Sequence, residues 1–239
     1  MIERHLTRTR ARHDIDEDEE RAIRGLVAEA RTIEARRTFI REGDKLDFST
    51  LLLDGLMCRY KDLTNGQRQV TELHVPGDFA DMHSFTLKRL DHNMQALTEC
   101  VVGIVPHERI QRMTETHPRL ARIYWFSTNL DAAIHREWEV SLGKRTAAER
   151  TAALFCEMHV RLGLVGMADP DGYAFPLTQT ELAECLGITP IHLNRTLKEL
   201  REAGLVELKN RRVALLDLPR LRATADFDDG YLYLNPDPL

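Results

Sequence analysis

The stretch that decides the fold runs from residue 178 to residue 216, TQTELAECLGITPIHLNRTLKELREAGLVELKNRRVALL. Thr178 and Glu181 have the spacing of a capping box, in which a hydroxyl and a carboxylate each satisfy a free backbone N–H at a helix start. Gly187 follows where a left-handed residue ends a helix. Thr189, two residues later, can cap another helix. The pattern predicts two short helices joined by a tight turn.

The second of these helices is expected to reach about Ala203 and to have two unlike faces. Leu193, Leu197 and Leu200 recur at helical spacing and predict a buried stripe. The other face is polar and basic, as in a helix-turn-helix whose second helix enters the DNA major groove. The residues expected to contact DNA from the two helices and their caps are Thr178, Thr189, Pro190, Ile191, His192, Asn194, Arg195 and Lys198.

A basic hairpin is predicted after these helices. Residues 205–208 and 213–216 have the composition of strands, and Lys209-Asn210-Arg211 lies between them as a turn. Arg211 and Arg212 are expected to contact the DNA backbone. Residues 189–222 hold eight Lys or Arg against four Asp or Glu, in a chain of net charge −5. This concentration of positive charge favours a winged DNA-binding domain over the alternative, a purely structural helical hairpin.

Length and composition set broader limits. A chain of 239 residues can form two domains, and its 43% hydrophobic and 30% charged residues are typical of a globular protein. Cys58, Cys100, Cys156 and Cys185 are too scattered for a disulfide framework or a zinc knuckle, although single cysteines leave redox control open. No signal peptide or membrane-length apolar run is seen, so a cytoplasmic protein is expected. No catalytic motif is found, so an enzyme is not expected.

The sequence pattern of the N-terminal half is typical of a small β-domain. Residues 1–17 are polar and short of large apolar groups, which predicts a flexible arm, and a helix is expected over about Glu19–Ala30. Between Thr32 and Val105 short β-rich segments alternate with turns, of which Asn65-Gly66 is the clearest hairpin signal. Strands at roughly ten-residue spacing predict a β-roll, within a sensory domain spanning residues 18–117.

A long helix is predicted over residues 118–143. Its apolar stripe has the spacing of a heptad seam, which predicts pairing with a second copy of the chain, since a helix-turn-helix reading a two-fold site also needs a dimer. The alternative is that the stripe packs on the β-roll. The residues of this stripe are Leu120, Ile123, Ser127, Leu130, Ile134 and Trp138. Residues 144–225 are then assigned to the DNA-binding domain and residues 226–239 to an acidic tail.

This order of parts resembles the Crp/Fnr family of bacterial transcription regulators. The most specific pieces are Arg41-Glu42-Gly43-Asp44, Pro76-Gly77-Asp78-Phe79, residues 182–195 and Leu205-Val206. The resemblance implies an α+β chain with a jelly-roll-like β-roll, a dimerisation helix and a winged helix-turn-helix. It also implies a homodimer that binds a two-fold-related operator on double-stranded DNA, acts on RNA polymerase, and senses a signal through the roll.

The residues of the sensing site depart from the family pattern. Members that bind cyclic nucleotides hold the phosphate with a Gly-Glu pair and an Arg-Ser pair, and the matching places here hold Asp81-Met82 and Leu90-Asp91. Carboxylates without an arginine repel a phosphate, so cyclic AMP binding is not expected. The Thr-Ser pair of the long helix is replaced by His135-Arg136. The cysteine cluster of oxygen-sensing members is absent, so an iron–sulfur cluster is not expected.

Two alternatives concern the signal and the partner. Met82-His83-Ser84 resembles the segment of the family's haem-binding carbon-monoxide sensor in which the His is an axial ligand, and Asp78, Asp81, His83 and His92 suggest a metal ion instead. Candidate effector residues are therefore Asp81, His83, His92, His135 and Arg136. A winged helix can also hold another protein rather than DNA.

The recognition helix also departs from the nucleotide-sensing members. The positions where those members read bases with Arg, Glu and Arg hold Pro190, Ile191 and Arg195 here. Arg195 can make a bidentate contact to guanine, whereas Ile191 can only contact a thymine methyl group. The operator is therefore expected to differ from that of the nucleotide-sensing members.

Overall fold

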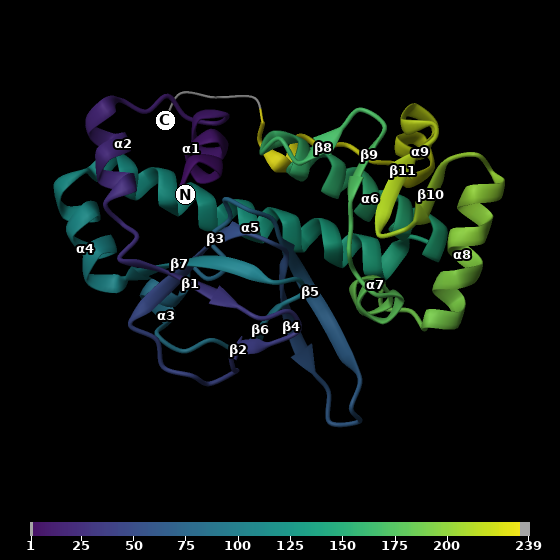
Figure 1. The fold of residues 1–239 in the computed structure, drawn as a ribbon, viewed down its shortest axis with the longest axis horizontal. Coiled ribbons are helices and arrows are strands. Elements are labelled where there is room, and N and C mark those ends of the chain that lie inside the picture. Colours follow the sequence, from purple (N-terminus) through teal and green to yellow (C-terminus); the bar gives the residue numbers. More distant parts are fainter. Residues whose placement is uncertain (1, 235–239) are drawn as a thin grey trace. The chain divides into compact units, whose positions relative to one another are not determined.

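The computed structural model describes residues 2–234, which form two compact units. The first unit holds the residues up to Lys61, Glu72–Ala133 and Tyr233, and the second holds Asp62–Thr71 and Ile134–Leu232. Figure 1 labels the helices and strands in chain order. The combination of a β-domain, a long helix and a helical C-terminal region is α+β, as predicted. None of the described helices is long and apolar enough to cross a membrane.

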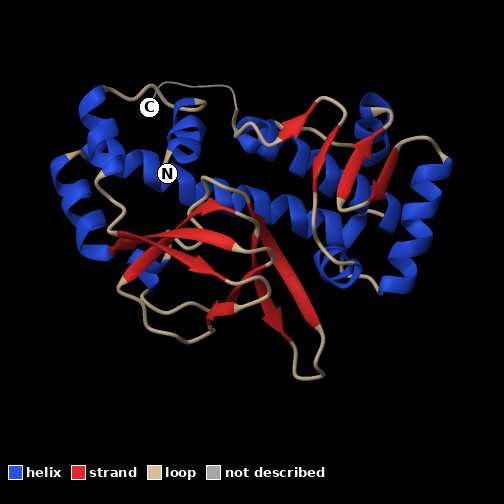
Figure 2. Ribbon diagram, in the orientation of Figure 1, coloured by secondary structure: helices blue, strands red, loops and turns tan. Residues whose placement is uncertain are grey.

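Two antiparallel sheets form the roll, most of which belongs to the first unit (Figure 2). One has the order β1-β7-β3, with β1 at Glu29–Ile33, β7 at Cys100–Pro106 and β3 at Phe48–Asp54. The other has the order β2-β6-β4-β5, with β2 at Thr38–Ile40, β6 at Asn93–Ala96, β4 at Met57–Asp62 and β5 at Arg68–His74. The predicted roll is confirmed, but β1 was not among the expected strands.

The core of the roll explains why β3 has a continuous apolar run. Leu51 and Leu53 belong to one buried cluster with Phe79 and Val105, whereas Leu52 belongs to another cluster. Successive side chains of a strand point to opposite faces, so a strand that is buried on both faces loses the usual alternation of apolar and polar residues.

Three helices flank the roll: α2 (Glu17–Arg24), α3 (Ser84–Leu87) and α4 (His107–Thr116). The α2 helix begins earlier than expected because Asp16 caps it and forms a capping box with Glu19. It also ends earlier, at Arg24. Leu26 still contributes to the core, but from an irregular segment that leads into β1.

The N-terminal segment is not the flexible arm that its polarity predicted. Residues Glu3–Arg10 form α1, and Leu6 is fully buried in the core of the first unit. The His5 ring bonds to the Gly77 carbonyl at 2.8 Å and to the Tyr124 hydroxyl at 3.0 Å. The prediction of a flexible arm considered only large apolar residues. A buried histidine with two hydrogen bonds, such as His5, can also anchor a helix.

The long helix is α5 (Pro118–Lys144), close to its predicted bounds, but its apolar stripe is not a free surface. Leu120 and Ile123 belong to the core cluster of the first unit, and Leu130 and Ile134 are also buried. Five of the six predicted dimer residues are therefore buried within the single chain, and only Ser127 is half-buried. The assignment of this stripe to the dimer seam is wrong, because a helical pattern shows that a face is buried but not what buries it.

The second unit contains α6 (Ala147–Leu164), α7 (Gln179–Leu186), α8 (Pro190–Glu202), α9 (Leu218–Ala225) and the short 3-10 helix η1 (Gly230–Leu232). A small sheet of order β10-β11-β9-β8 completes it. The wing strands are β10 (Val206–Lys209) and β11 (Arg212–Leu215), each within one residue of the prediction. The segment between α6 and α7 supplies β8 (Ala168–Asp169) and β9 (Gly172–Ala174), which extend the wing sheet.

A buried carboxylate anchors the C-terminal segment of this unit. Glu157 on α6 accepts hydrogen bonds from Trp138 Nε1 at 3.0 Å, from Arg161 at 2.8 Å and from the Tyr231 hydroxyl at 2.8 Å. These bonds explain why Trp138 is unavailable to a partner. The predicted acidic tail is therefore packed at Phe227, Tyr231 and Leu232, and Asp237 lies outside the described residues.

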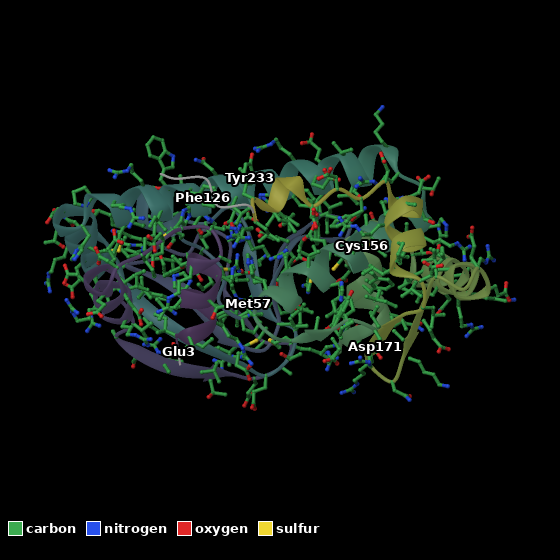
Figure 3. The ribbon with its side chains drawn as sticks, turned by 90° about the horizontal axis from the view of Figure 1, so that it is seen from above. Glu3, Met57, Phe126, Cys156, Asp171 and Tyr233 are labelled. Carbon is green, nitrogen blue, oxygen red and sulfur yellow. The ribbon has the colours of Figure 1, made fainter. Side chains whose placement is uncertain are left out.

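The four cysteines are free and buried. Burial raises the pKa of Cys100 to about 11 and that of Cys156, labelled in Figure 3, to about 12. A thiol with a raised pKa carries little thiolate at neutral pH and reacts slowly. These two positions therefore behave as core residues rather than as redox-reactive thiols.

Candidate nucleic-acid interface

The helix-turn-helix forms as its local sequence predicts. The Thr178 hydroxyl accepts from the Glu181 backbone N–H at 3.2 Å, and Glu181 accepts from the Thr178 backbone N–H in return. Gly187 has φ +63°, the left-handed conformation that ends α7. Thr189 caps α8 by accepting from the His192 N–H at 3.2 Å, with Pro190 in the first turn. These local bonds fix the angle at which α8 leaves the turn.

The α8 helix buries one face and exposes the other. Leu193, Thr196 and Leu200 are buried, while Leu197 is only half-buried. The eight residues of the two helices and their caps that are expected to contact DNA are all exposed, and Ile191 exposes 70% of its surface. A large apolar side chain this exposed at the start of a recognition helix is available to contact a thymine methyl group.

The exposed polar residues of α8 differ in how they are held. Asn194 donates to Gln179 of α7 at 3.0 Å, and Lys198 lies 3.7 Å from Glu202. Arg195 makes no hydrogen bond or ion pair among residues 2–234. Gln179 was not predicted as part of the interface, although its position directly after the Thr178 cap placed it beside the recognition helix.

The two arginines of the wing differ in their contacts. Asn210 and Arg211 form the turn with φ values of +51° and +59°, as in the tight two-residue turn of a hairpin. Arg211 is exposed at this tip. Arg212 instead lies 3.3 Å from Asp169 and 3.0 Å from Asp171, so it is already partly neutralised. Of the two predicted backbone contacts, Arg211 is the better placed.

A second polar cluster, missed by the sequence analysis, lies inside the roll. Arg59 on β4 is buried and donates to the Ala80 carbonyl at 2.6 Å, to Glu72 at 2.8 Å and to Asp131 of α5 at 2.9 Å. Burial alone would lower the pKa of Arg59, but the two carboxylates outweigh it and raise the pKa. The sequence did hold one sign of this cluster, because Arg59 is the only charged residue in the otherwise apolar segment LMCRY at residues 56–60.

The predicted effector residue Asp81 is part of this interior. It is fully buried and accepts from the backbone N–H and the hydroxyl of Thr50. Burial raises its pKa to about 7, although the Thr50 bonds and Arg59 oppose the shift. The nearby Arg59 guanidinium is already bound to Glu72 and Asp131.

The other candidate effector residues do not form a metal group. The rings of His83 and His92 lie 5.3 Å apart, and burial lowers the pKa of both, that of His83 to about 3. No three His, Cys, Asp or Glu side chains converge to hold a metal anywhere in residues 2–234. His135 is half-buried and Arg136 is exposed, both in the second unit.

The two units match two known domain families. Residues 30–117 match the family described as cyclic nucleotide-binding domain, and residues 149–224 match the Crp-like helix-turn-helix domain. The chain is 30% identical over 180 residues to the nitrogen fixation regulation protein FixK of Bradyrhizobium diazoefficiens, covering 73% of this chain and 72% of that protein. It is 28% identical over 223 residues to the transcriptional activator protein FnrL of Cereibacter sphaeroides, covering 90% and 88%.

The fold is also found in a solved structure. FixK2 from Bradyrhizobium japonicum matches with a TM-score of 0.76 and 23% identity, covering 83% of this chain and 98% of that one. This likeness concerns the fold. The two family matches follow each other along the chain in the order predicted from the sequence.

Proposed function

Because the chain belongs to the Crp/Fnr family of transcription regulators, we propose that it acts as a homodimer that reads a two-fold-related operator and needs no cyclic AMP. The observation that carries the proposal is α8, whose start exposes Ile191, His192 and Arg195. An exposed arginine without a partner in the described chain is suited to a bidentate contact with guanine. Arg211 at the wing tip supplies a backbone contact that carries no sequence information.

We place the dimer contact on the face of α5 opposite to the buried stripe. At about 100° per residue, a shift of two positions moves to the other side of a helix. Arg122, Trp125, Asn129, Arg136 and Val140 are exposed at spacings of three, four and seven residues. Trp125 exposes 70% of its surface and Val140 exposes 51%. A narrow seam with these apolar members suits a second copy of the same helix.

The independence from cyclic AMP rests on the roll interior. The buried Asp81 stands at the sequence position of the Gly-Glu pair with which nucleotide-binding members hold the phosphate. Arg59, which could otherwise neutralise a phosphate, is bound to Glu72 and Asp131. Placing an anion beside a buried carboxylate costs free energy unless a free cation compensates it.

The test is selection of bound sites from random duplex DNA with the purified full chain and no added nucleotide. We expect enrichment of a two-fold motif whose half-sites lie about one helical turn apart. Binding should weaken steeply as salt rises, since phosphate contacts release counterions. Enrichment of a single half-site would refute the dimeric reader, and no enrichment with salt-independent binding would favour a protein partner.

The proposed dimer contact on α5 can be tested by mutation. Trp125→Glu places a charge in the proposed seam and should convert a dimer to a monomer in sedimentation velocity. Leu87→Glu is the matched control, because Leu87 is an exposed apolar residue of α3, away from the seam. A Trp125→Glu protein that remains dimeric would place the contact elsewhere.

A further inference from the structure

A pair of exposed side-chain amides links the two helices of the helix-turn-helix (Figure 1). Gln179 is the first residue of α7, and Asn194 lies in the second turn of α8. The Nδ2 amino group of Asn194 donates to Oε1 of Gln179 at 3.0 Å, and both side chains are exposed. Two residues that are 15 positions apart are therefore joined at the exposed face of the recognition helix.

This hydrogen bond contributes little to the stability of the fold. Water competes for exposed amides, so a bond between two of them gains little free energy. The turn between the helices is already fixed by Gly187 and the Thr189 cap, and Leu193 and Leu200 bury the other face of α8. The effect of the bond is to hold the Asn194 amide in one orientation, with its Nδ2 atom turned toward α7.

The Asn194 amide that is held in this way keeps one donor and one acceptor free. An amide nitrogen carries two hydrogens, and the bond to Gln179 uses one of them. The second hydrogen and the Oδ1 atom of Asn194 make no hydrogen bond among residues 2–234. An amide that offers one N–H and one C=O can make a bidentate contact to adenine, whose N6 donates and whose N7 accepts.

The other bases do not offer this combination in the major groove. Guanine presents two acceptors, cytosine presents one donor, and thymine presents one acceptor beside a methyl group. An amide held with both groups toward the DNA satisfies only one of its two hydrogen bonds at any of these bases. The free groups of Asn194 therefore favour adenine over the other three bases.

The place of this adenine in the operator follows from the neighbours of Asn194. Arg195, the predicted guanine contact, is the next residue, and Ile191 lies one helical turn earlier on the same exposed face. Neighbouring Cα atoms are about 3.8 Å apart and successive base pairs are about 3.4 Å apart. We therefore expect the adenine within about two base pairs of the guanine that Arg195 reads.

We infer that Asn194 is a base-reading residue that selects adenine in each half-site, and that Gln179 positions its amide through the bond between α7 and α8. The inference rests on the proposed function, because it names a base that the proposed reader selects. An amide that is already oriented loses less rotational freedom on binding, so Gln179 raises affinity without touching the base. Asn194 contacts the base, whereas Gln179 acts through Asn194.

The test uses the full chain and the operator that the selection yields. Each adenine of the half-site is replaced in turn, in both half-sites together, by 7-deazaadenine, which keeps Watson–Crick pairing but lacks the N7 acceptor. We expect one position at which the replacement weakens binding of the wild type about tenfold or more. Asn194→Ala should bind the unmodified operator about tenfold or more weaker, and the replacement at that position should then have no further effect.

Gln179→Met separates positioning from folding, because it removes the acceptor at similar size and unchanged charge. It should weaken operator binding about threefold in the otherwise wild-type chain. In the Asn194→Ala chain it should have no effect, because no amide is left to position, whereas a merely structural role would cost the same affinity in both chains. Gln111→Met is the matched control and should leave binding unchanged, because Gln111 is an exposed glutamine of α4 that bonds to Glu115.

The results that would overturn the inference are distinct from failure of the proposed function. A wild type that is insensitive to the replacement at every adenine would overturn it, and so would an Asn194→Ala protein that keeps the wild-type sensitivity. Equal losses from Gln179→Met in both chains would overturn the positioning role of Gln179. Failure to select any operator would remove the proposed function, and this inference with it, before any modified DNA is made.

Discussion

Arg59 and Arg195 show two opposite uses of the same side chain. Arg59 is buried in the roll and gives its hydrogen bonds to Ala80, Glu72 and Asp131. Arg195 is exposed on α8 and has no partner among residues 2–234. A buried arginine that is paired with carboxylates of its own chain supports the fold. An exposed arginine without a partner, near the start of a helix with one polar face, is available to bind DNA. We therefore expect the DNA contacts at α8 rather than inside the roll.

The largest effect expected from this contrast is on stability. Arg59→Met leaves Glu72 and Asp131 without their cation and should lower the free energy of unfolding by about 3–5 kcal/mol in urea denaturation. Arg4→Met is the control, because Arg4 forms an exposed pair with Asp54 and should cost at most about 1 kcal/mol. Equal losses for the two variants would mean that Arg59 is not the organising charge of the roll.

The next effect concerns DNA. Arg195→Ala should weaken binding to the selected operator by about 1–3 kcal/mol and relax preference at one base pair, with no loss of stability. Arg211→Ala should instead weaken binding to all sequences alike and reduce the salt slope by about one. Quantitative binding assays on the operator and on scrambled DNA would measure both. Identical behaviour of the two variants would remove the distinction between base and backbone contacts.

The buried carboxyl of Asp81 should make the stability of the protein depend on pH. Its pKa is about 7 in the folded protein against an ordinary 3.8, so between these values the folded state binds the proton more tightly than the unfolded state. The stability of the wild type should therefore fall as pH rises from about 4 to about 7. Asp81→Asn should flatten this part of the profile, as measured by urea denaturation at several pH values. Asp91→Asn should not, because the hydrogen bond to His92 lowers the pKa of Asp91.

The smallest expected effect separates capping from DNA contact. Thr178→Ala removes the hydroxyl that accepts from Glu181 and should cost about 1 kcal/mol in thermal unfolding. Thr178→Ser keeps the cap and should restore it. If Thr178→Ala lost DNA affinity without losing stability, the hydroxyl would act on phosphate rather than as a cap.

The sequence predicted most accurately what local chemistry decides. The capping box at Thr178, the left-handed Gly187 and the turn at Asn210 are each set by a few neighbouring residues, and the structure has them where they were expected. The stripe on α5 was read correctly as apolar but assigned to the wrong surface. Whether Leu120 contacts its own chain or a second one depends on tertiary packing, which spacing does not encode.

The buried polar contacts of the first unit could not be predicted from the sequence either. Arg59, Glu72 and Asp131 are far apart in the chain, and no local pattern joins them. His5 likewise seats α1 through partners at Gly77 and Tyr124. Contacts of this kind turn a polar N-terminal segment into packed structure, and only the arrangement in space reveals them.

The buried Arg59 of the roll is paired within the chain, whereas Arg195 of α8 is left available to DNA. The most direct measurement is the affinity of the purified chain for its selected operator with and without cyclic AMP at fixed salt concentration. We expect specific binding without the nucleotide and the same dissociation constant when it is present. A tightening of about tenfold or more on adding cyclic AMP would contradict this expectation, since Asp81 and the Arg59 cluster would then have to admit a phosphate.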